Sequence, residues 1–287
     1  MRAGYFGPEG TNTQEALLAD TVGLELGTVP LPTIYDTVMA VHEGTVDIAM
    51  VPIENSLEGS VNATLDALAM ETDDVMIVGE VVQPIRHCLI ARTSLELPEI
   101  ETVVSHPQAN AQCARFIRTR LPNARVLAGS STADAVRVVA DHDGPWAALG
   151  NRLAAELYGC QVLRAGVEDV ADNETRFVWL ARTGAAPGGP RVLASGAPPL
   201  GPWKTAVVFW GVGSEAPGWL VACLAEFAER GVNLTRIESR PRKQGLGRYM
   251  FFVDMEGHES DGAVAEALSG LRGHVERLKI LGSYPAA

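Results

Sequence analysis

The sequence predicts an α/β protein in two parts, and three observations lead to this fold class. Over residues 1–182, short apolar runs alternate with stretches of helical period. Residues 183–202 are half glycine or proline and carry almost no charge, so they are expected to form a linker. Residues 203–287 show the element order βαββαβ, which is the ferredoxin-like plan.

The first part alternates strands and helices along the chain. Strands are expected at residues 46–53, 102–104 and 125–127, and helices at residues 37–42, 60–70, 109–121 and 132–140. This order indicates layers in which helices cover a mostly parallel sheet. Ligands of such sheets bind beyond the carboxyl ends of the strands, where helices begin. Three polar loops occupy such positions: residues 7–11, 54–60 and 105–108.

The second part has a clearer plan. Strands are expected at residues 205–210, 232–239, 249–255 and 275–284, and helices at residues 217–230 and 264–271. Pro217 suits the first turn of a helix, and Gly231 suits its C-terminal cap. Elements in this order form a two-layer sandwich, with both helices on one face of the sheet.

The formal net charge of −12 argues against nucleic acid or an anionic membrane as a partner, since both attract basic surfaces. An anionic substrate would therefore need a locally positive site. The four cysteines lie far apart, which favours buried thiols in a reducing compartment over disulfides or zinc ligands. The first residues lack the apolar stretch of a signal peptide, and no apolar run is long enough to span a bilayer. A cytoplasmic protein is expected.

Each polar loop has a structural interpretation beside a functional one. The loop at residues 7–11 precedes a helix whose start matches a capping box, so a plain turn explains it. Its glycines and free N–H groups would equally suit an anion. The loop at residues 54–60 carries more amide and hydroxyl groups than a turn needs, which leaves structure and function balanced. His106 has no partner at metal-ligand spacing, so a structural or positioning role is favoured.

Residues 173–180 place an arginine at the start of an apolar strand. Arg176 is either an edge residue that reaches solvent or a fork that binds a carboxylate in two places. A strand period of two puts Thr175 and Phe177 on one face and Arg176 on the other. All three could then face one substrate only if the strand began after them.

Residues 211–216 follow a strand and precede a helix, and they resemble a dinucleotide-binding fingerprint. Glu238, at the end of the next strand, adds to this likeness. The region has only 85 residues and the order βαββαβ, which is too small for a doubly wound nucleotide domain. Nicotinamide binding is therefore disfavoured.

Four segments in series resemble the prephenate dehydratase family: residues 7–11, 52–56, 105–113 and 173–177. The second part resembles the ACT regulatory domain of the same enzymes, through residues 217–220 and 231–241. No single segment is decisive, but together they occur in the family's order and cover nearly the whole chain. Asn12 and Trp219 depart from the family's pattern, in which an aromatic residue and a small residue are usual at these positions.

The resemblance implies a catalytic domain at residues 1–182 and an ACT domain at residues 203–287, joined by the linker at residues 183–202. The catalytic domain would hold two α/β subdomains around a cleft, as in periplasmic binding proteins. The implied reaction converts prephenate to phenylpyruvate, water and carbon dioxide in L-phenylalanine biosynthesis, with no metal or organic cofactor. L-Phenylalanine is the implied feedback effector, and a homodimer or homotetramer is the implied assembly. Arogenate dehydratase and a non-catalytic small-molecule sensor remain alternatives.

The resemblance also implies roles for individual residues. Thr175 matches the catalytic threonine and would donate a hydrogen bond or a proton to the departing hydroxyl. The substrate-binding residues would be Thr11, Asn55, Ser56, Ser105, Gln112, Arg176 and Phe177, with Arg176 as the local positive charge. The effector-binding residues would be Gly218, Leu220, Asn233, Leu234, Glu238, Ser239 and Arg240, and the Trp219 indole could narrow or fill that pocket. Glu54 is given no catalytic role, because a carboxylate would repel the substrate.

Overall fold

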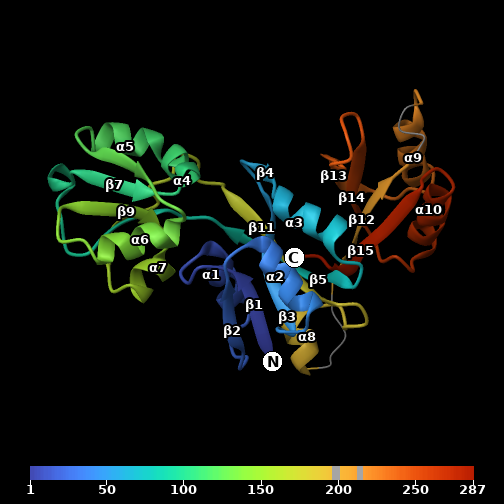
Figure 1. The fold of residues 1–287 in the computed structure, drawn as a ribbon, viewed down its shortest axis with the longest axis horizontal. Helices are drawn as coiled ribbons and strands as arrows, with labels where there is room; N and C mark the ends of the chain where they lie inside the picture. Colours follow the sequence, from blue (N-terminus) through green and yellow to red (C-terminus); the bar gives the residue numbers. More distant parts are fainter. Residues whose placement is uncertain (196–200, 212–215) are drawn as a thin grey trace.

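The computed structural model describes residues 1–195, 201–211 and 216–287, which form three bodies in a row (Figure 1). We call the central α/β body lobe A, the α/β body at one end lobe B, and the body at the other end the C-terminal domain. The predicted fold class, two α/β subdomains followed by a βαββαβ domain, is confirmed. Within the described residues, no helix is long and apolar enough to cross a membrane.

The elements of the three bodies follow the chain. Lobe A holds β1 (Arg2–Phe6), α1 (Asn12–Asp20), β2 (Gly27–Leu31), α2 (Ile34–His42), β3 (Ile48–Asn55), β4 (Gly59–Ser60), α3 (Asn62–Asp66), the π-helical turn η1 (Ala67–Glu71), β5 (Val75–Pro84), β11 (Glu174–Arg182) and α8 (Gly189–Ser195). Lobe B holds β6 (Cys88–Ala91), the short 3-10 turn η2 (Leu97–Glu99), β7 (Thr102–Ser105), α4 (Pro107–Gln112), α5 (Ala114–Arg120), β8 (Arg125–Ala128), α6 (Thr132–Ala140), β9 (Trp146–Gly150), α7 (Arg152–Leu157) and β10 (Gln161–Ala165). The C-terminal domain holds β12 (Trp203–Trp210), α9 (Trp219–Ala228), β13 (Leu234–Pro241), β14 (Tyr249–Glu256), α10 (Gly262–Arg272) and β15 (Arg277–Pro285).

The sheets of the two lobes are mixed, which corrects the prediction of a mostly parallel sheet. Lobe A has the strand order β2-β1-β3-β11-β5, and lobe B has the order β10-β6-β9-β7-β8. The pairs β1–β2, β1–β3, β7–β8 and β7–β9 are parallel, but β11 runs antiparallel to both β3 and β5. In lobe B, β6 runs antiparallel to β9 and β10. In lobe A, the cause is the path of the chain, which leaves lobe A after β5 and returns on β11. A strand that returns from the other lobe enters lobe A at the opposite end.

The predictions for one helix and for the linker also differ from the structure. The helix expected at residues 109–121 is divided into α4 and α5 at Cys113. The linker expected at residues 183–202 contains α8, and a Cβ built on Gly189 would lie 3.0 Å from the Trp179 indole. Gly/Pro composition indicates that a segment has little structure by itself, whereas residues 189–195 form a helix that packs on lobe A. Residues 196–200 of the linker and residues 212–215 of the fingerprint segment lie outside the described residues.

Strand β11 is buried on both faces. Phe177 and Trp179 belong to a core that includes Leu17 of α1. Val178 and Leu180 point the other way, into a core that lobe A shares with the C-terminal domain. The alternation of side chains along a strand thus gives β11 one face for each core. The C-terminal domain therefore packs on lobe A through a shared apolar core.

Lobe A and the C-terminal domain approach each other backbone to backbone at Gly282 of β15. Its φ is +152°, and a Cβ at this position would overlap the backbone carbonyl of Ile77 in β5. Backbone atoms cannot move aside as a flexible side chain can, so only glycine permits this contact.

We expect Gly282→Ala to lower the free energy of unfolding by at least about 2 kcal/mol, because the added methyl group must push two packed strands apart. Gly245→Ala is the matched control, since Gly245 also has a positive φ, +109°, but no atoms within 4 Å of an added Cβ. Urea unfolding of the three proteins measures the difference. An equal loss in both variants would show that backbone conformation, and not the contact with Ile77, makes glycine necessary.

Candidate active site

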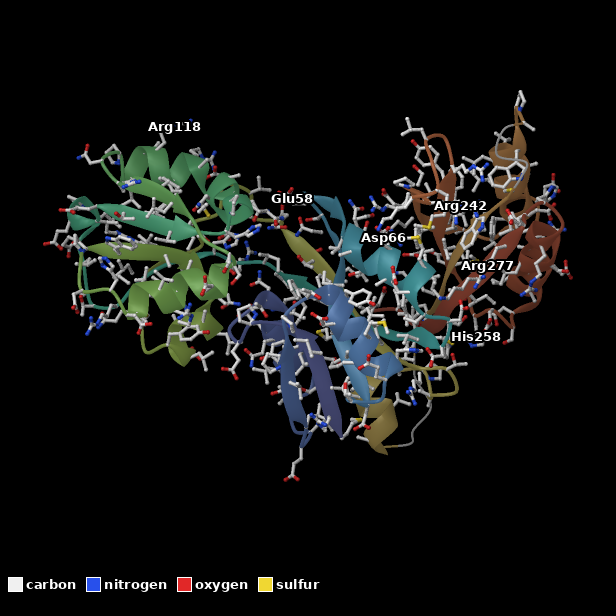
Figure 2. The ribbon with its side chains drawn as sticks, viewed as in Figure 1. Glu58, Asp66, Arg118, Arg242, His258 and Arg277 are labelled. Atoms are coloured by element: carbon white, nitrogen blue, oxygen red, sulfur yellow. The ribbon has the colours of Figure 1, made fainter. Side chains whose placement is uncertain are left out.

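A cavity of about 310 Å³ lies between lobe A and lobe B. Lobe A lines it with the loop after β1, the start of α1, the end of β3 and one face of β11. Lobe B lines it with the first turns of α4 and α6. Glu58, in the loop between β3 and β4, lies on the side of lobe A that faces lobe B (Figure 2). The cavity is therefore built from segments far apart in the sequence.

Thr175 stands on the wall of the cavity, with its hydroxyl held by a neighbouring strand. Residues Thr175 and Asn55 are partners in the β11–β3 ladder, and Asn55 Nδ2 donates to Thr175 Oγ1 at 2.9 Å. An oxygen that accepts from an amide directs its own hydrogen away from that amide. The Thr175 hydroxyl hydrogen therefore remains available for a further acceptor, and Thr175 lines the cavity.

Asn55 begins a chain of side-chain hydrogen bonds that joins the two lobes. Its Nδ2 also donates to Asn173 Oδ1 at 2.7 Å, and Asn173 Nδ2 donates to Gln112 Oε1 at 3.2 Å. His87 Nε2 lies 2.9 Å from the same Gln112 oxygen, which can only accept, so Nε2 carries the proton. These buried amides fix one another, because each would lose a partner if it turned.

Helix N-termini supply the positive potential of the cavity. Thr11 caps α1, accepting from Gln14 N at 3.4 Å, and Ser131 caps α6, accepting from Asp134 N at 2.9 Å. The N–H groups of a first turn have no acceptor within the helix, and the helix dipole adds partial positive charge there. These two capped ends, one from each lobe, line this cavity together with the first turn of α4. Together they form a place where an anion is stabilised without a cationic side chain.

Charged side chains are absent from the described part of the cavity lining, which contains no lysine, arginine, aspartate or glutamate. Hydroxyl, amide and imidazole groups make up its polar part. The site is therefore neutral but rich in donors, and it lies within a chain whose formal net charge is −12.

The two lobes also touch beside the cavity. Gly10 has a φ of +84°, and a Cβ there would lie 3.1 Å from Cβ of Ala154 in α7. Asn151 Nδ2 donates to Asn12 Oδ1 at 3.0 Å, again from lobe B to lobe A. Asn12, which departs from the family's pattern, thus takes part in a contact between the lobes.

The structure brings five of the predicted substrate-site residues to this cavity: Thr11, Asn55, Gln112, Thr175 and Phe177. Their chemical roles stay predictions. Ser56 and Ser105 do not line it. Ser105 is fully buried and donates to Leu149 O at 2.7 Å, whereas Ser56 is exposed and accepts from Glu174 N at 3.0 Å. Both hydroxyls hold backbone in place and neither lines the cavity, so the structure gives no support to their predicted roles in substrate binding.

Arg176 gives the main correction. Its guanidinium does not reach the cavity, because the alternation of β11 sends it to the opposite face from Thr175. There its Nη2 lies 2.6 Å from Asp254 Oδ2 and its Nη1 lies 3.1 Å from Glu80 Oε2. The Arg176 side chain is 10% exposed, and Glu54 completes its acidic surroundings at 3.1 Å. The predicted carboxylate fork is therefore an internal ion-pair partner.

The charges around Arg176 stabilise one another across the boundary between lobe A and the C-terminal domain. Burial would raise the pKa of Asp254, but the attraction of Arg236 and Arg176 holds it below its ordinary value. Burial would lower the pKa of Arg176, but the attraction of Asp254 raises it. Asp254 is therefore a carboxylate that bridges two arginines.

The polar residues of the cavity that received no role from the sequence include His87, Asn173, Ser131 and Thr132. Ser131 and Thr132 had a usable signal, since residues 130–132 precede an expected helix that follows an expected strand, as residues 7–11 do. His87 and Asn173 lie on the two segments that join the lobes. No local pattern marks His87, whose neighbours in space come from other parts of the chain, and Asn173 lies in the recognised segment 173–177 but was given no role of its own.

The predicted effector residues do not meet in one place within the single chain. Gly218 and Leu220 line a second cavity of about 260 Å³ in the C-terminal domain. Glu238 and Arg240 instead point toward lobe A, where Glu238 accepts from Ser60 Oγ at 3.1 Å. Arg240 forms a two-point ion pair with Asp66 of α3, at 3.2 Å and 2.9 Å. Figure 2 shows Asp66 on the helix that faces the C-terminal domain.

The other predicted effector residues lie on the surface of the same domain. Asn233 and Ser239 are exposed, and Leu234 is half-buried at the start of β13. Trp219 borders the second cavity, donates from Nε1 to His274 O at 2.7 Å and packs against Phe209 and Phe251. The indole is therefore part of the domain's own packing and forms one wall of this cavity.

Comparisons with known proteins agree over the whole chain. A family profile described as prephenate dehydratase matches residues 3–185, and one described as ACT domain matches residues 215–273. A prephenate dehydratase from Amycolatopsis methanolica is 40% identical over 288 residues, covering 100% of this chain and 89% of that protein.

Two solved structures are similar over almost their full lengths. The prephenate dehydratase from Arthrobacter aurescens, solved in complex with L-Phe, has a TM-score of 0.88 at 39% identity, covering 99% of this chain and 90% of that one. GqqA, described as a novel type of quorum-quenching acylase, has a TM-score of 0.85 at 33% identity, covering 100% and 98%.

These matches confirm the predicted resemblance, and with it the expected class of carbon–oxygen lyases. The cavity between lobes A and B lies within the matched residues 3–185, and the βαββαβ domain contains the second match. The chain belongs to the prephenate dehydratase family and carries an ACT domain after its two α/β lobes.

Proposed function

We propose that the protein removes water and carbon dioxide from prephenate to give phenylpyruvate. The observation that carries this proposal is the Thr175 hydroxyl, which lines the cavity and accepts a hydrogen bond from Asn55. In the reaction, the bond between the ring and its carboxylate breaks, and its electrons move into the ring. The bond to the hydroxyl on the opposite ring carbon then breaks with its electrons. The departing oxygen takes up one proton and becomes water, while the ring becomes aromatic.

Thr175 would donate to this oxygen as negative charge develops on it. A threonine hydroxyl is a weak acid, so hydrogen bonding and positioning carry more of the rate than proton transfer does. Phe177, on the same face of β11, would pack against the ring. The hydrogen-bonded chain from Asn55 to His87 would keep the donor in place when the substrate enters.

The neutral cavity suits a substrate that must lose a carboxylate. A fixed arginine beside that carboxylate would stabilise its charge before the reaction and oppose its loss as carbon dioxide. The N-termini of α1 and α6 instead offer N–H groups and hydroxyls, which stabilise a dianion with less pull on one group. The acyclic carboxylate of prephenate, which does not react, would be bound by one of these helix ends.

The absence of acidic side chains from the described lining favours prephenate over arogenate, whose ammonium group would need an anionic partner. We expect the purified protein to form phenylpyruvate from prephenate with a kcat/KM at least about 10-fold above that for arogenate. Absorbance of phenylpyruvate in alkali follows the first reaction, and chromatography of phenylalanine follows the second. No turnover of either substrate would refute the proposed function, and a preference for arogenate would refute the choice of substrate.

Replacing Thr175 with valine removes the donor and keeps the shape of the side chain. We expect Thr175→Val to lower kcat by at least about 100-fold, the usual effect of a lost transition-state donor. Thr175→Ser should retain more activity, since the hydroxyl remains. Ser56→Ala is the control, because Ser56 holds the same strand from outside the cavity and should stay within about 3-fold of wild type. Near-normal turnover by a folded Thr175→Val protein would remove the assigned role.

The likeness to GqqA raises acyl transfer as a second activity for the same cavity. An acylase of this kind needs a nucleophile with a general base within hydrogen-bond reach. The hydrogen-bond partner of Thr175 Oγ1 is the amide nitrogen of Asn55, which has no basic lone pair. At Thr175, this arrangement therefore favours elimination, in which the hydroxyl only donates.

The ACT domain is the proposed site of regulation by L-phenylalanine. Support comes from the L-Phe complex of the relative that is 39% identical. Gly218 and Leu220 beside the second cavity, with Asn233 and Leu234 at the start of β13, are the residues proposed to contact the effector. Glu238, Ser239 and Arg240 would support this site through β13.

The remaining parts of the proposal are a cytoplasmic location and a homodimer or homotetramer. Light scattering that gave the mass of one chain would contradict the proposed assembly.

Titration of the protein with L-phenylalanine in a calorimeter should give saturable heat, and the same ligand should inhibit turnover. Gly218→Val should weaken binding at least about 10-fold, because Gly218 has a φ of +84° and lines the second cavity. Gly231→Val is the matched control, with a φ of +68° but no place in that cavity. Heat no larger than that from D-phenylalanine would rule out the proposed effector.

A further inference from the structure

Two neighbouring residues of β11 serve two different domains. Thr175 faces the cavity between the lobes, and Arg176 faces the ACT domain. Their Cα atoms are separated by one rigid peptide unit, about 3.8 Å. Any force that shifts the backbone at Arg176 therefore shifts Thr175 as well.

Arg176 pairs with Asp254 of the ACT domain and with Glu80 and Glu54 of lobe A, and the ACT domain holds Glu80 in turn. Asp254 of β14 is 2.6 Å from its Nη2, and Arg236 of β13 fixes the same carboxylate at 2.9 Å. Glu80 of β5 is 3.1 Å from its Nη1, and Lys204 of β12 lies 2.7 Å from that carboxylate. Three strands of the ACT sheet thus supply or hold the two buried carboxylates that pair with this guanidinium.

This cluster differs from the other ion pairs between the same domains. The pair Arg240–Asp66 joins β13 to α3, and Arg277–Asp73 joins β15 to an exposed loop. Neither pair involves β11. In contrast, the Glu80 and Asp254 side chains are each 1% exposed, so water cannot replace the contacts that Arg176 would lose.

We propose that Arg176 is a positioning residue, through which the ACT domain holds β11 so that Thr175 meets the departing hydroxyl of the substrate. Arg176 touches no substrate in this proposal, which rests on the proposed dehydratase function. The position of Thr175 must be held closely, because a displacement of about 1 Å at a reacting group lowers rates by about 100-fold.

The test compares Arg176→Met, Arg176→Lys and Asp254→Asn with the wild-type full chain. Arg176→Met is the mildest way to open the link, because Asp254 keeps Arg236, Glu80 keeps Lys204, and Glu54, which loses its partner, is 37% exposed to water. We expect kcat for prephenate to fall at least about 30-fold in this variant, with KM within about 3-fold of wild type. Arg176→Lys should recover part of the loss, and Asp254→Asn should lower kcat in the same way.

Asp66→Asn is the matched control, since it weakens an ion pair between the same two domains that does not involve β11. It should leave kcat within about 2-fold of wild type. Hydrogen exchange supplies a readout that needs no activity. The backbone amides of β11 should exchange at least about 10-fold faster in Arg176→Met than in wild type. In Asp66→Asn their exchange rates should equal those of wild type.

Several results would overturn the proposal. A raised KM with unchanged kcat in Arg176→Met would mean that the arginine binds substrate after all. Unchanged kcat and KM, or an equal fall in Asp66→Asn, would mean that the cluster only joins the domains. If Arg176→Met does not fold, Arg176→Lys and Asp254→Asn must show the fall in kcat, or the proposal fails. Absence of prephenate turnover in the wild type would refute the proposed function. The amide exchange of β11 in Arg176→Met would then test by itself whether Arg176 ties β11 to the ACT domain.

Discussion

A strand has two faces, and in this protein one face of β11 lines the cavity while the other contacts the ACT domain. One face presents Thr175 and Phe177 to the cavity, and the other sends Arg176 to Asp254 of the ACT domain. The cavity, the shared apolar core and the position of the ACT domain all depend on this one strand. Because neither face can turn without exposing charge or apolar surface, β11 has a single permitted orientation.

The cavity shows how an acidic chain can receive an anion. Its described lining contains no lysine or arginine, and the N-termini of α1 and α6 supply the attraction instead. The net charge of the chain predicted a local cation for an anionic substrate. Arg176 and Arg236 are such cations, but they neutralise buried acids at the domain boundary. Dipoles suit the proposed chemistry better, because they bind a dianion without fixing the charge of the carboxylate that must leave.

Lobe A and the ACT domain behave as one packed unit. They share an apolar core, they meet backbone to backbone at Gly282 and Ile77, and buried ion pairs join them beside β11. Interiors packed in this way shift between discrete arrangements and do not deform gradually. A movement of the ACT domain therefore acts on the strand that carries Thr175, without the need for a long path of contacts.

The sequence by itself determined the features that depend on near neighbours. The apolar run that became β3, the cap at Thr11 and the order βαββαβ are local patterns, and the strand period correctly separated Thr175 from Arg176. Only the tertiary structure decided which groups those side chains meet. Arg176 pairs with a carboxylate 78 residues away, Asn55 with an amide 118 residues away, and Ser105 with a carbonyl in another strand. An arginine binds any carboxylate, so its partner is set by how strands and domains pack and not by the residue's own chemistry.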